Sequence, residues 1–173
     1  MNIVLMGYRG CGKTTVGRIV AEKLNRPFVD TDAMIQERAG KTIREIVADG
    51  GWAAFRSLER GVVEELAGRE GCIVALGGGA VLDQQNVKEL KRNGSFIWLT
   101  ADGETIAERL GNDQATNAQR PSLSGMDMVA EIETMLRDRE PVYRMAADQV
   151  IDTTGRSVDE VANEIMQMTE QKN

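Results

Sequence analysis

The segment Gly7–Thr14 constrains the possible fold of this chain more than any other. It reads Gly-Tyr-Arg-Gly-Cys-Gly-Lys-Thr and fits the pattern G-x-x-x-x-G-K-S/T in full. The apolar run Ile3–Met6 precedes it, and a helical pattern with one apolar face follows it. A phosphate-binding loop requires this succession of strand, loop and helix. A glycine-rich turn before an ordinary helix is the alternative, and the agreement between residues and context disfavours it.

Each residue type in this loop suits the binding of a nucleoside triphosphate. The glycines permit backbone conformations that a side chain would block, so successive N–H groups can point at an anion. The helix that starts near Lys13 adds its positive N-terminal end. We expect Lys13 to reach the β- and γ-phosphates of ATP and the Thr14 hydroxyl to bind Mg²⁺. The nucleotide-binding residues predicted in the loop are Gly10, Cys11, Gly12, Lys13, Thr14 and Thr15.

Composition excludes several other kinds of protein. The length of 173 residues suits a single domain with a real core. The net charge is −6 and the basic residues are scattered, so we expect no nucleic-acid partner. No apolar run approaches the roughly 18 residues of a membrane span, and residues 1–6 are interpreted as a strand instead of a signal peptide. We therefore expect a cytoplasmic protein without a membrane partner.

Histidine is absent from the chain, which excludes His-based catalytic triads and His-ligated metal sites. A metal would be bound by oxygen ligands, and this favours Mg²⁺. The two cysteines, Cys11 and Cys72, are predicted to be free thiols instead of a disulfide.

Two carboxylates follow the strand predicted near residues 27–29. Asp30 and Asp32 stand at its carboxyl end, where open α/β sheets bind their ligands. If the extended geometry persists, both side chains point the same way. One would then assist Mg²⁺, and the other would accept hydrogen bonds from substrate hydroxyls. The equally weighted alternative is that one of them caps the helix predicted near Ala33.

The segment Asp49-Gly50-Gly51 separates two predicted helices, near residues 42–48 and 52–66. In the second helix, Trp52 and Phe55 are three residues apart, and we expect both to face the core.

Arg56 and Glu59 share this spacing, and by themselves they indicate only a surface ion pair. The apolar strand predicted at 72–76 then leads into Gly77-Gly78-Gly79. Three successive glycines favour a segment where a ligand approaches the backbone closely, with a flexible turn as the alternative.

Residues 111–125 are polar, rich in Asn and Gln and without apolar periodicity. A loop of this length inside a compact domain is usually functional or disordered. It contains Arg120, and in a phosphoryl-transfer enzyme such a segment would act as a lid that brings positive charge to the phosphate. A helix is predicted from Asp127 to about Arg139.

Strands and helices alternate along the whole chain, which predicts an α/β protein. The expected fold is a three-layer α/β/α sandwich with a central five-stranded parallel sheet, in one domain over residues 1–173. The strands are predicted near residues 2–6, 27–29, 72–76, 95–99 and 148–151.

The chain resembles shikimate kinase, a family of small P-loop kinases related to nucleoside monophosphate kinases. The resemblance covers nearly the whole chain, and the order of its motifs is highly specific. The motifs are Gly7–Thr14, Asp30-Thr31-Asp32, Phe55-Arg56 with Glu59, Gly77–Ala80, Arg120-Pro121, and Arg139 before Val142-Tyr143.

The resemblance implies transfer of the ATP γ-phosphate to the 3-hydroxyl of shikimate, in chorismate and aromatic amino acid biosynthesis. It also implies a substrate-binding region at about 31–62 and a lid at about 111–125. On the acceptor side, Arg56 and Arg139 would bind the shikimate carboxylate, for which guanidinium groups are well suited. Asp32 would accept from ring hydroxyls, and Gly78 and Gly79 would bind through the backbone.

On the nucleotide side, the resemblance places Asp30 near Mg²⁺ and the attacking hydroxyl. Arg120 would reach the phosphates, and Arg109 and Arg156 would flank the adenine. Lys13, Arg120 and Mg²⁺ would neutralise the transferring group, and Asp30 or Asp32 would take the hydroxyl proton late.

Two other functions remain open at this point. A kinase of the same fold acting on gluconate or a nucleoside monophosphate is the nearer one, and a nucleotide-binding module without catalysis is the other. The expected partners are small molecules, shikimate and ATP, and the expected assembly is a monomer or weak homodimer.

Overall fold

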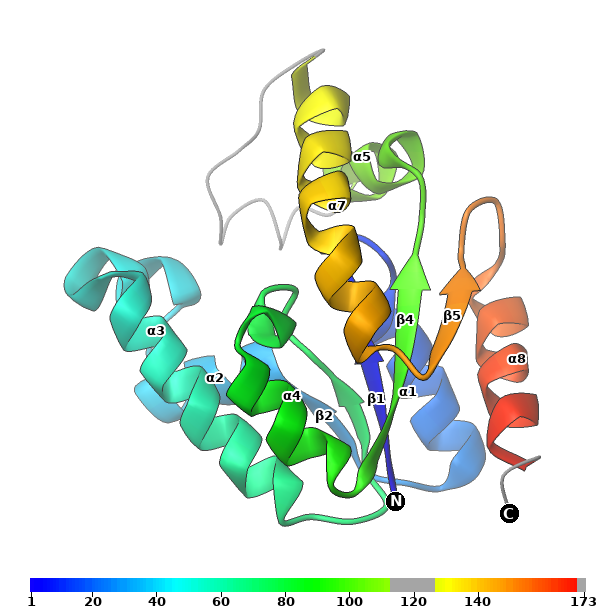
Figure 1. The fold of residues 1–173 in the computed structure, drawn as a ribbon, viewed down its shortest axis with the longest axis horizontal. Helices are drawn as coiled ribbons and strands as arrows, with labels where there is room; N and C mark the ends of the chain where they lie inside the picture. Colours follow the sequence, from blue (N-terminus) through cyan, green and yellow to red (C-terminus); the bar gives the residue numbers. More distant parts are fainter. Residues whose placement is uncertain (113–126, 171–173) are drawn as a thin grey trace.

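The computed structural model describes residues 1–112 and 127–170. Five parallel strands form one sheet in the order β2-β3-β1-β4-β5, which confirms the predicted sheet (Figure 1). Their bounds are Asn2–Met6 for β1, Phe28–Asp30 for β2, Ile73–Ala75 for β3, Gly94–Thr100 for β4 and Gln149–Asp152 for β5.

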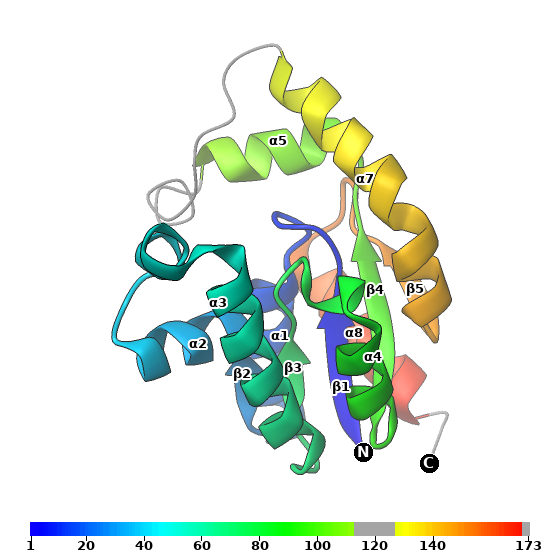
Figure 2. The ribbon, with the colours of Figure 1, turned by 60° about the vertical axis from the view of Figure 1, so that its left-hand side comes forward.

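Helices cover both faces of this sheet (Figures 1 and 2). The central strand β1 is buried throughout, because successive side chains point to opposite faces and both faces are covered. Ile3 and Leu5 pack with α1 and α8, whereas Val4 and Met6 pack with α3, α4 and the end of α7. The helices are α1 Lys13–Leu24, α2 Thr31–Ala39, α3 Ile43–Ala67, α4 Gln84–Lys91, α5 Gly103–Asn112, α7 Asp127–Ala146 and α8 Val158–Glu170, with a 3₁₀ turn at Ala80–Leu82.

The break predicted between two helices near residue 50 is a kink within α3. Gly51 has a φ of 71°, which is outside the helical region and in the range that favours glycine. The expectation that Trp52 faces the core is wrong, because this side chain is 57% exposed. It lies directly after the kink, and only Phe55 of the pair is buried.

Helix α7 extends further than its sequence predicts. The predicted end is near Arg139, yet the helix continues to Ala146 with Pro141 inside it. Interior prolines cost roughly 3 kcal/mol. Beyond the proline, Tyr143 and Ala146 are buried against the sheet, and their packing offsets this cost. As a result, Arg139 and Tyr143 stand on successive turns of one helix.

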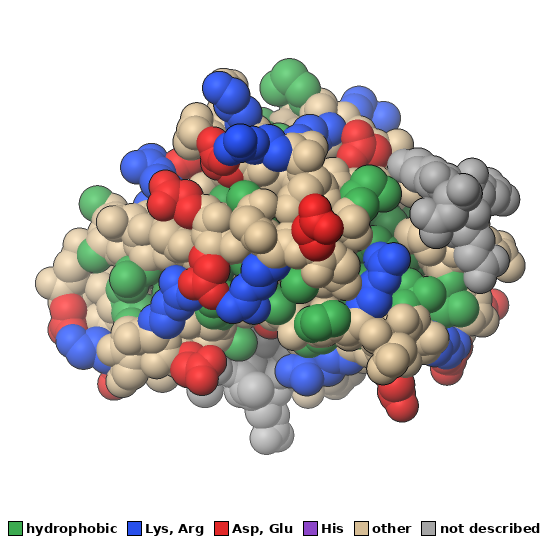
Figure 3. Space-filling view, turned by 90° about the horizontal axis from the view of Figure 1, so that it is seen from below, with side chains coloured by type: hydrophobic (Ala, Val, Ile, Leu, Met, Phe, Trp, Pro, Cys, Tyr) green, Lys and Arg blue, Asp and Glu red, His purple; other side chains and the backbone are tan. Residues whose placement is uncertain are grey.

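One face of the molecule agrees with the scattered charge of the sequence. Seen from the end of the sheet where the strands begin, basic and acidic side chains are interspersed (Figure 3). None of the helices in the described part of the chain combines the length and apolarity needed to cross a membrane.

Candidate active site

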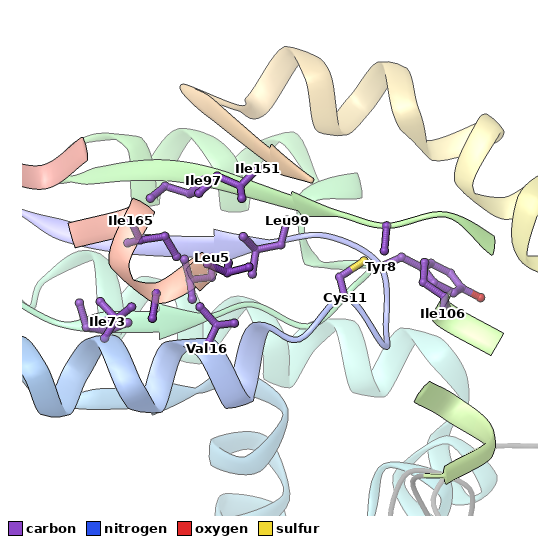
Figure 4. Close-up of a cluster of buried hydrophobic side chains, with 14 of the residues drawn as sticks. Leu5, Tyr8, Cys11, Val16, Ile73, Ile97, Leu99, Ile106, Ile151 and Ile165 are labelled. Carbon is purple, nitrogen blue, oxygen red and sulfur yellow. The ribbon is translucent and has the colours of Figure 1, made fainter. Parts of the chain in front are cut away.

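The loop between β1 and α1 has the backbone that its glycines predict. Gly10 and Gly12 have φ values of 80° and 91°, which residues with side chains rarely adopt. Helix α1 begins at Lys13, directly after Gly12, so its positive end adjoins the loop. The Cys11 side chain points away from the loop's surface into the core, near Tyr8 and Ile106 (Figure 4). Burial raises the pKa of the Cys11 thiol, which is therefore kept neutral.

Polar side chains that the sequence singled out meet at this loop. Lys13 Nζ donates to the carbonyl oxygens of Gly7 and Tyr8, each at 2.9 Å. The Thr14 hydroxyl donates to Oδ2 of Asp30, the last residue of β2, at 2.7 Å. A hydroxyl and a carboxylate side by side are oxygen ligands of the kind that Mg²⁺ prefers. No larger cluster of acidic or cysteine side chains suited to a metal occurs in the described residues.

The two aspartates after β2 have different geometries. Helix α2 begins at Thr31, so the extended geometry ends at Asp30 and does not persist to Asp32. Asp30 caps this helix, because its Oδ1 accepts from the backbone N–H groups of Asp32 and Ala33 at 3.0 and 3.2 Å. Its other oxygen accepts from Thr14, so capping and the predicted site coexist in one residue. Asp32 lies in the first turn of α2.

A cavity of about 710 Å³ opens over the loop at the carboxyl end of the sheet. It collects most of the predicted nucleotide and metal residues, together with two acceptor residues. These are Gly10, Cys11, Gly12, Lys13, Thr14, Thr15, Asp30, Asp32, Gly78, Arg109 and Arg156. Sequence reasoning missed other lining residues, because isolated residues such as Thr153 and variable motif positions such as Arg9 carry no signal of their own. Further examples are Ile43, Leu76, Leu110, Asn112 and Ser157.

Arg109 and Arg156 are held in place by the chain itself. Arg109 donates to the carbonyl oxygen of Gly10 at 3.3 Å, and to the hydroxyl and carbonyl oxygens of Thr153 at 3.0 and 2.9 Å. It therefore ties the phosphate-binding loop to the segment between β5 and α8. Arg156 forms an ion pair with Glu164 at 2.6 Å.

Beside the cavity, Arg56 and Glu59 form a partly buried pair instead of the surface pair that their spacing indicates. Arg56 Nη1 lies 2.7 Å from Glu59 Oε1, and Glu59 is only 1% exposed. Burial raises the pKa of the Glu59 carboxyl, although the Arg56 guanidinium opposes this rise. The Arg56 guanidinium also lies over the rings of Trp52 and Phe55.

None of the three glycines after β3 has a positive φ, so what distinguishes Gly77 and Gly79 is the space that a Cβ would occupy. A Cβ on Gly79 would overlap the Arg56 guanidinium, and one on Gly77 would overlap the Asp32 carboxylate. A Cβ on Gly78 would lie 3.4 Å from the carbonyl oxygen of Gly7 in the phosphate-binding loop. Gly77 and Gly79 therefore leave room for the Asp32 carboxylate and the Arg56 guanidinium, and Gly78 between them lies next to the phosphate-binding loop.

Helix α7 also contributes side chains that contact Gly78. Arg139 Nη1 donates to the Gly78 carbonyl oxygen at 3.3 Å, and the Tyr143 hydroxyl donates to the same oxygen at 2.5 Å. The Arg139 guanidinium also lies 5.5 Å from the centre of the Tyr8 ring. Burial raises the pKa of Tyr143 to about 12, so the phenol stays a hydrogen-bond donor.

The structure thus brings the predicted residues together in two adjoining groups. Arg56, Gly79 and Arg139 are next to the cavity instead of lining it, and Gly78 connects the two groups. The predicted Arg120 and most of the predicted lid lie outside the described residues.

The family model and the similar curated proteins point to one family. The family model described as shikimate kinase matches residues 9–170. A shikimate kinase of Syntrophus aciditrophicus is 47% identical, over 95% of this chain and 89% of that protein. One from Symbiobacterium thermophilum is 42% identical, over 99% and 98%. Among solved structures, a shikimate kinase from Acinetobacter baumannii in complex with shikimate has a TM-score of 0.89 and 34% identity, covering 99% of this chain and 94% of that one.

Proposed function

This chain belongs to the shikimate kinase family, and we propose that it transfers the γ-phosphate of ATP to the 3-hydroxyl of shikimate. The products are shikimate 3-phosphate and ADP, in the biosynthesis of chorismate and aromatic amino acids. The observation that carries the proposal is the junction at Gly78, where a phosphate-binding loop adjoins a segment flanked by two arginines. This arrangement suits a triphosphate on one side and a small carboxylate on the other.

On the nucleotide side, the N–H groups of the glycine-rich loop and the start of α1 bind the phosphates. Lys13 holds its ammonium at the mouth of this loop, where it neutralises the transferring phosphoryl group. The oxygens of Thr14 and Asp30 would hold Mg²⁺, which would add positive charge to the β- and γ-phosphates. Arg109 and Arg156 line the same cavity, and in this proposal they flank the adenine.

On the acceptor side, Arg56 and Arg139 bind the shikimate carboxylate as charge-assisted hydrogen-bond donors. Asp32 accepts hydrogen bonds from the ring hydroxyls, and Gly78 and Gly79 contact the acceptor through their backbone. The fixed partners of both arginines support this assignment, because a preorganised guanidinium loses less freedom when it binds.

Catalysis in this proposal is mainly positioning and charge neutralisation. The transition state of phosphoryl transfer is loose, so little proton abstraction is needed early. Asp30 or Asp32 takes the hydroxyl proton late. Arg120, from the proposed lid at about 111–125, adds positive charge to the phosphoryl oxygens. The chain acts as one domain over residues 1–173, with residues 31–62 as the acceptor-binding region, and as a monomer or weak homodimer.

The test is ADP formation from Mg-ATP with shikimate, quinate, gluconate and AMP offered separately. We expect turnover that is specific to shikimate. Turnover with gluconate or AMP instead would retain the phosphoryl transfer and overturn the acceptor site. No turnover with any acceptor, together with intact ATP binding, would favour a binding module.

A further inference from the structure

The chain contains only two tyrosines, and both contact the same arginine or its hydrogen-bond acceptor. Tyr143 and Tyr8 are 1% and 5% exposed, and they come from α7 and from the phosphate-binding loop. Neither residue has a role in the proposed reaction. Their shared neighbour is Arg139, which the proposal assigns to the acceptor carboxylate.

The Gly78 carbonyl oxygen is the acceptor that Tyr143 and Arg139 share. The contact from the Tyr143 hydroxyl is the shorter, at 2.5 Å against 3.3 Å from Arg139 Nη1. Tyr143 is itself fixed, because its ring stacks on Trp98 of the strand β4 with centroids 5.6 Å apart. Tyr143 therefore anchors the Gly78 carbonyl to the sheet, and Arg139 aligns against an oxygen that is already in place.

The Tyr8 ring supplies the other surface against which Arg139 packs. Its centre lies 5.5 Å from the guanidinium carbon, a distance at which an aromatic face attracts a cation. The backbone carbonyl of Tyr8 accepts a hydrogen bond from Lys13. One residue of the phosphate-binding loop therefore contacts both the cation for the nucleotide and the cation for the acceptor.

The two acceptor arginines differ in how they are held. Arg56 is paired with the Glu59 carboxylate, whereas no carboxylate of the described residues forms an ion pair with Arg139. A neutral ring and a neutral carbonyl orient the guanidinium without cancelling its charge. Within the described part of the chain, no carboxylate therefore offsets the charge that Arg139 offers to an anionic ligand.

We propose that Tyr143 and Tyr8 are positioning residues that orient Arg139 towards the carboxylate of the acceptor, an inference that rests on the proposed function. Tyr143 acts through the Gly78 carbonyl, and Tyr8 acts through the face of its ring. Both residues determine how well the acceptor binds, and neither transfers a proton.

The experiment compares steady-state kinetics of native enzyme, Tyr143→Phe and Tyr8→Leu. We expect kcat/KM for shikimate to fall about fivefold in Tyr143→Phe, the effect of one lost hydrogen bond. In Tyr8→Leu we expect a fall of about threefold, the effect of a lost cation–π contact. KM for ATP should change less than about twofold in both. The pH profile of Tyr143→Phe should match the native profile, because a phenol with a pKa of about 12 stays protonated across the assay range.

A double-mutant cycle tests whether the tyrosine acts through the arginine. In an Arg139→Ala background, Tyr143→Phe should lower kcat/KM by less than about twofold. Leu90→Val is the matched control, because Leu90 belongs to the same buried cluster as Tyr143, and it should leave kcat/KM unchanged.

Three results would overturn the inference. The first is an unchanged kcat/KM for shikimate in Tyr143→Phe. The second is a rise in KM for ATP as large as the fall in kcat/KM for shikimate. The third is a fall in kcat/KM on adding Tyr143→Phe to Arg139→Ala that is as large as in the native background. Failure of the proposed function is distinguishable, because the native enzyme would then show no turnover with shikimate at all.

Discussion

The nucleotide side and the acceptor side of this site are built in different ways. The nucleotide side is one continuous segment, Gly7–Thr14, whose backbone conformation makes the binding surface. The acceptor side is assembled from α3, α7 and the glycines after β3, and Arg139 depends on a partner far away in the chain. Local backbone geometry determines the first, and packing between elements determines the second.

This difference predicts that variants of the two sides change different kinetic parameters. Changes on the nucleotide side should lower the rate of phosphoryl transfer, because the proposed function places positive charge there against the transferring group. Changes on the acceptor side should weaken acceptor binding, because the proposed function places the arginines against a part of the substrate that does not react.

The largest effect should come from Lys13→Ala. Removing one preorganised charge from a phosphoryl-transfer site lowers kcat by about 10²–10³-fold, and KM for shikimate should change little. Lys23→Ala is the control in the same helix, because Lys23 pairs with Asp159 on the surface. Rapid-quench measurement of the first turnover separates chemistry from product release. If Lys13→Ala raised KM for shikimate and left kcat unchanged, the proposed difference between the two sides would be wrong.

Arg139→Ala should have the next largest effect. A charge-assisted hydrogen bond to a carboxylate contributes about 1.5–3 kcal/mol, so kcat/KM for shikimate should fall about 10–100-fold. The fall should come mainly from KM, with kcat reduced much less.

The matched control for Arg139→Ala is Arg144→Ala on the same helix, because Arg144 is exposed and pairs with Glu140 one turn away. We expect near-native kinetics from this control. Equal losses in the two variants would mean that α7 tolerates no change, and they would remove the support for a specific role of Arg139.

The sequence predicted the two sides with unequal success. Lys13, Thr14 and the turn of α1 follow from one motif, because adjacent residues suffice to define the loop. The parallel sheet follows from alternating apolar strands and helices, and only its strand order needed the structure.

The acceptor side was predictable only through resemblance. The spacing of Arg56 and Glu59 indicated an ordinary surface pair, because spacing along a helix does not reveal what buries one partner. Trp52 was predicted to be buried, yet the kink at Gly51 turns it to solvent. The proposed role of Tyr143 depends on α7 continuing past Pro141, and tertiary packing there overrides the local signal for a helix end.

Gly79→Ala should weaken acceptor binding less than Arg139→Ala does. The φ of Gly79 is −105°, so alanine causes no backbone strain, and the added Cβ instead meets the Arg56 guanidinium. We expect KM for shikimate to rise about tenfold as Arg56 is displaced, the value of a lost or weakened charged hydrogen bond. Gly61→Ala is the control, because its Cβ would have no neighbour within 4 Å. In the interior of α3 this change should raise stability by about 0.5–1 kcal/mol. An unaltered KM in Gly79→Ala would show that the site does not need the close approach of Arg56.

The smallest effect concerns Glu59 and the dependence of stability on pH. Burial raises the pKa of Glu59 above its ordinary value of 4.5 in the folded chain, so the folded state binds this proton more tightly than the unfolded state does. The free energy of unfolding should therefore fall as pH rises from the ordinary pKa through the folded pKa, by about 1.4 kcal/mol for each unit between them. The side chain in Glu59→Gln cannot ionise. A plot of the thermal denaturation midpoint against pH should therefore be flatter for this variant than for the native chain above about pH 4.5. Parallel profiles would mean that the Arg56 charge fully compensates the buried carboxylate.

The same variant, Glu59→Gln, also bears on acceptor binding. Because its amide oxygen would still accept from Arg56, the rise in KM for shikimate should stay below that of Gly79→Ala. This difference separates a weakened partner of Arg56 from a displaced Arg56.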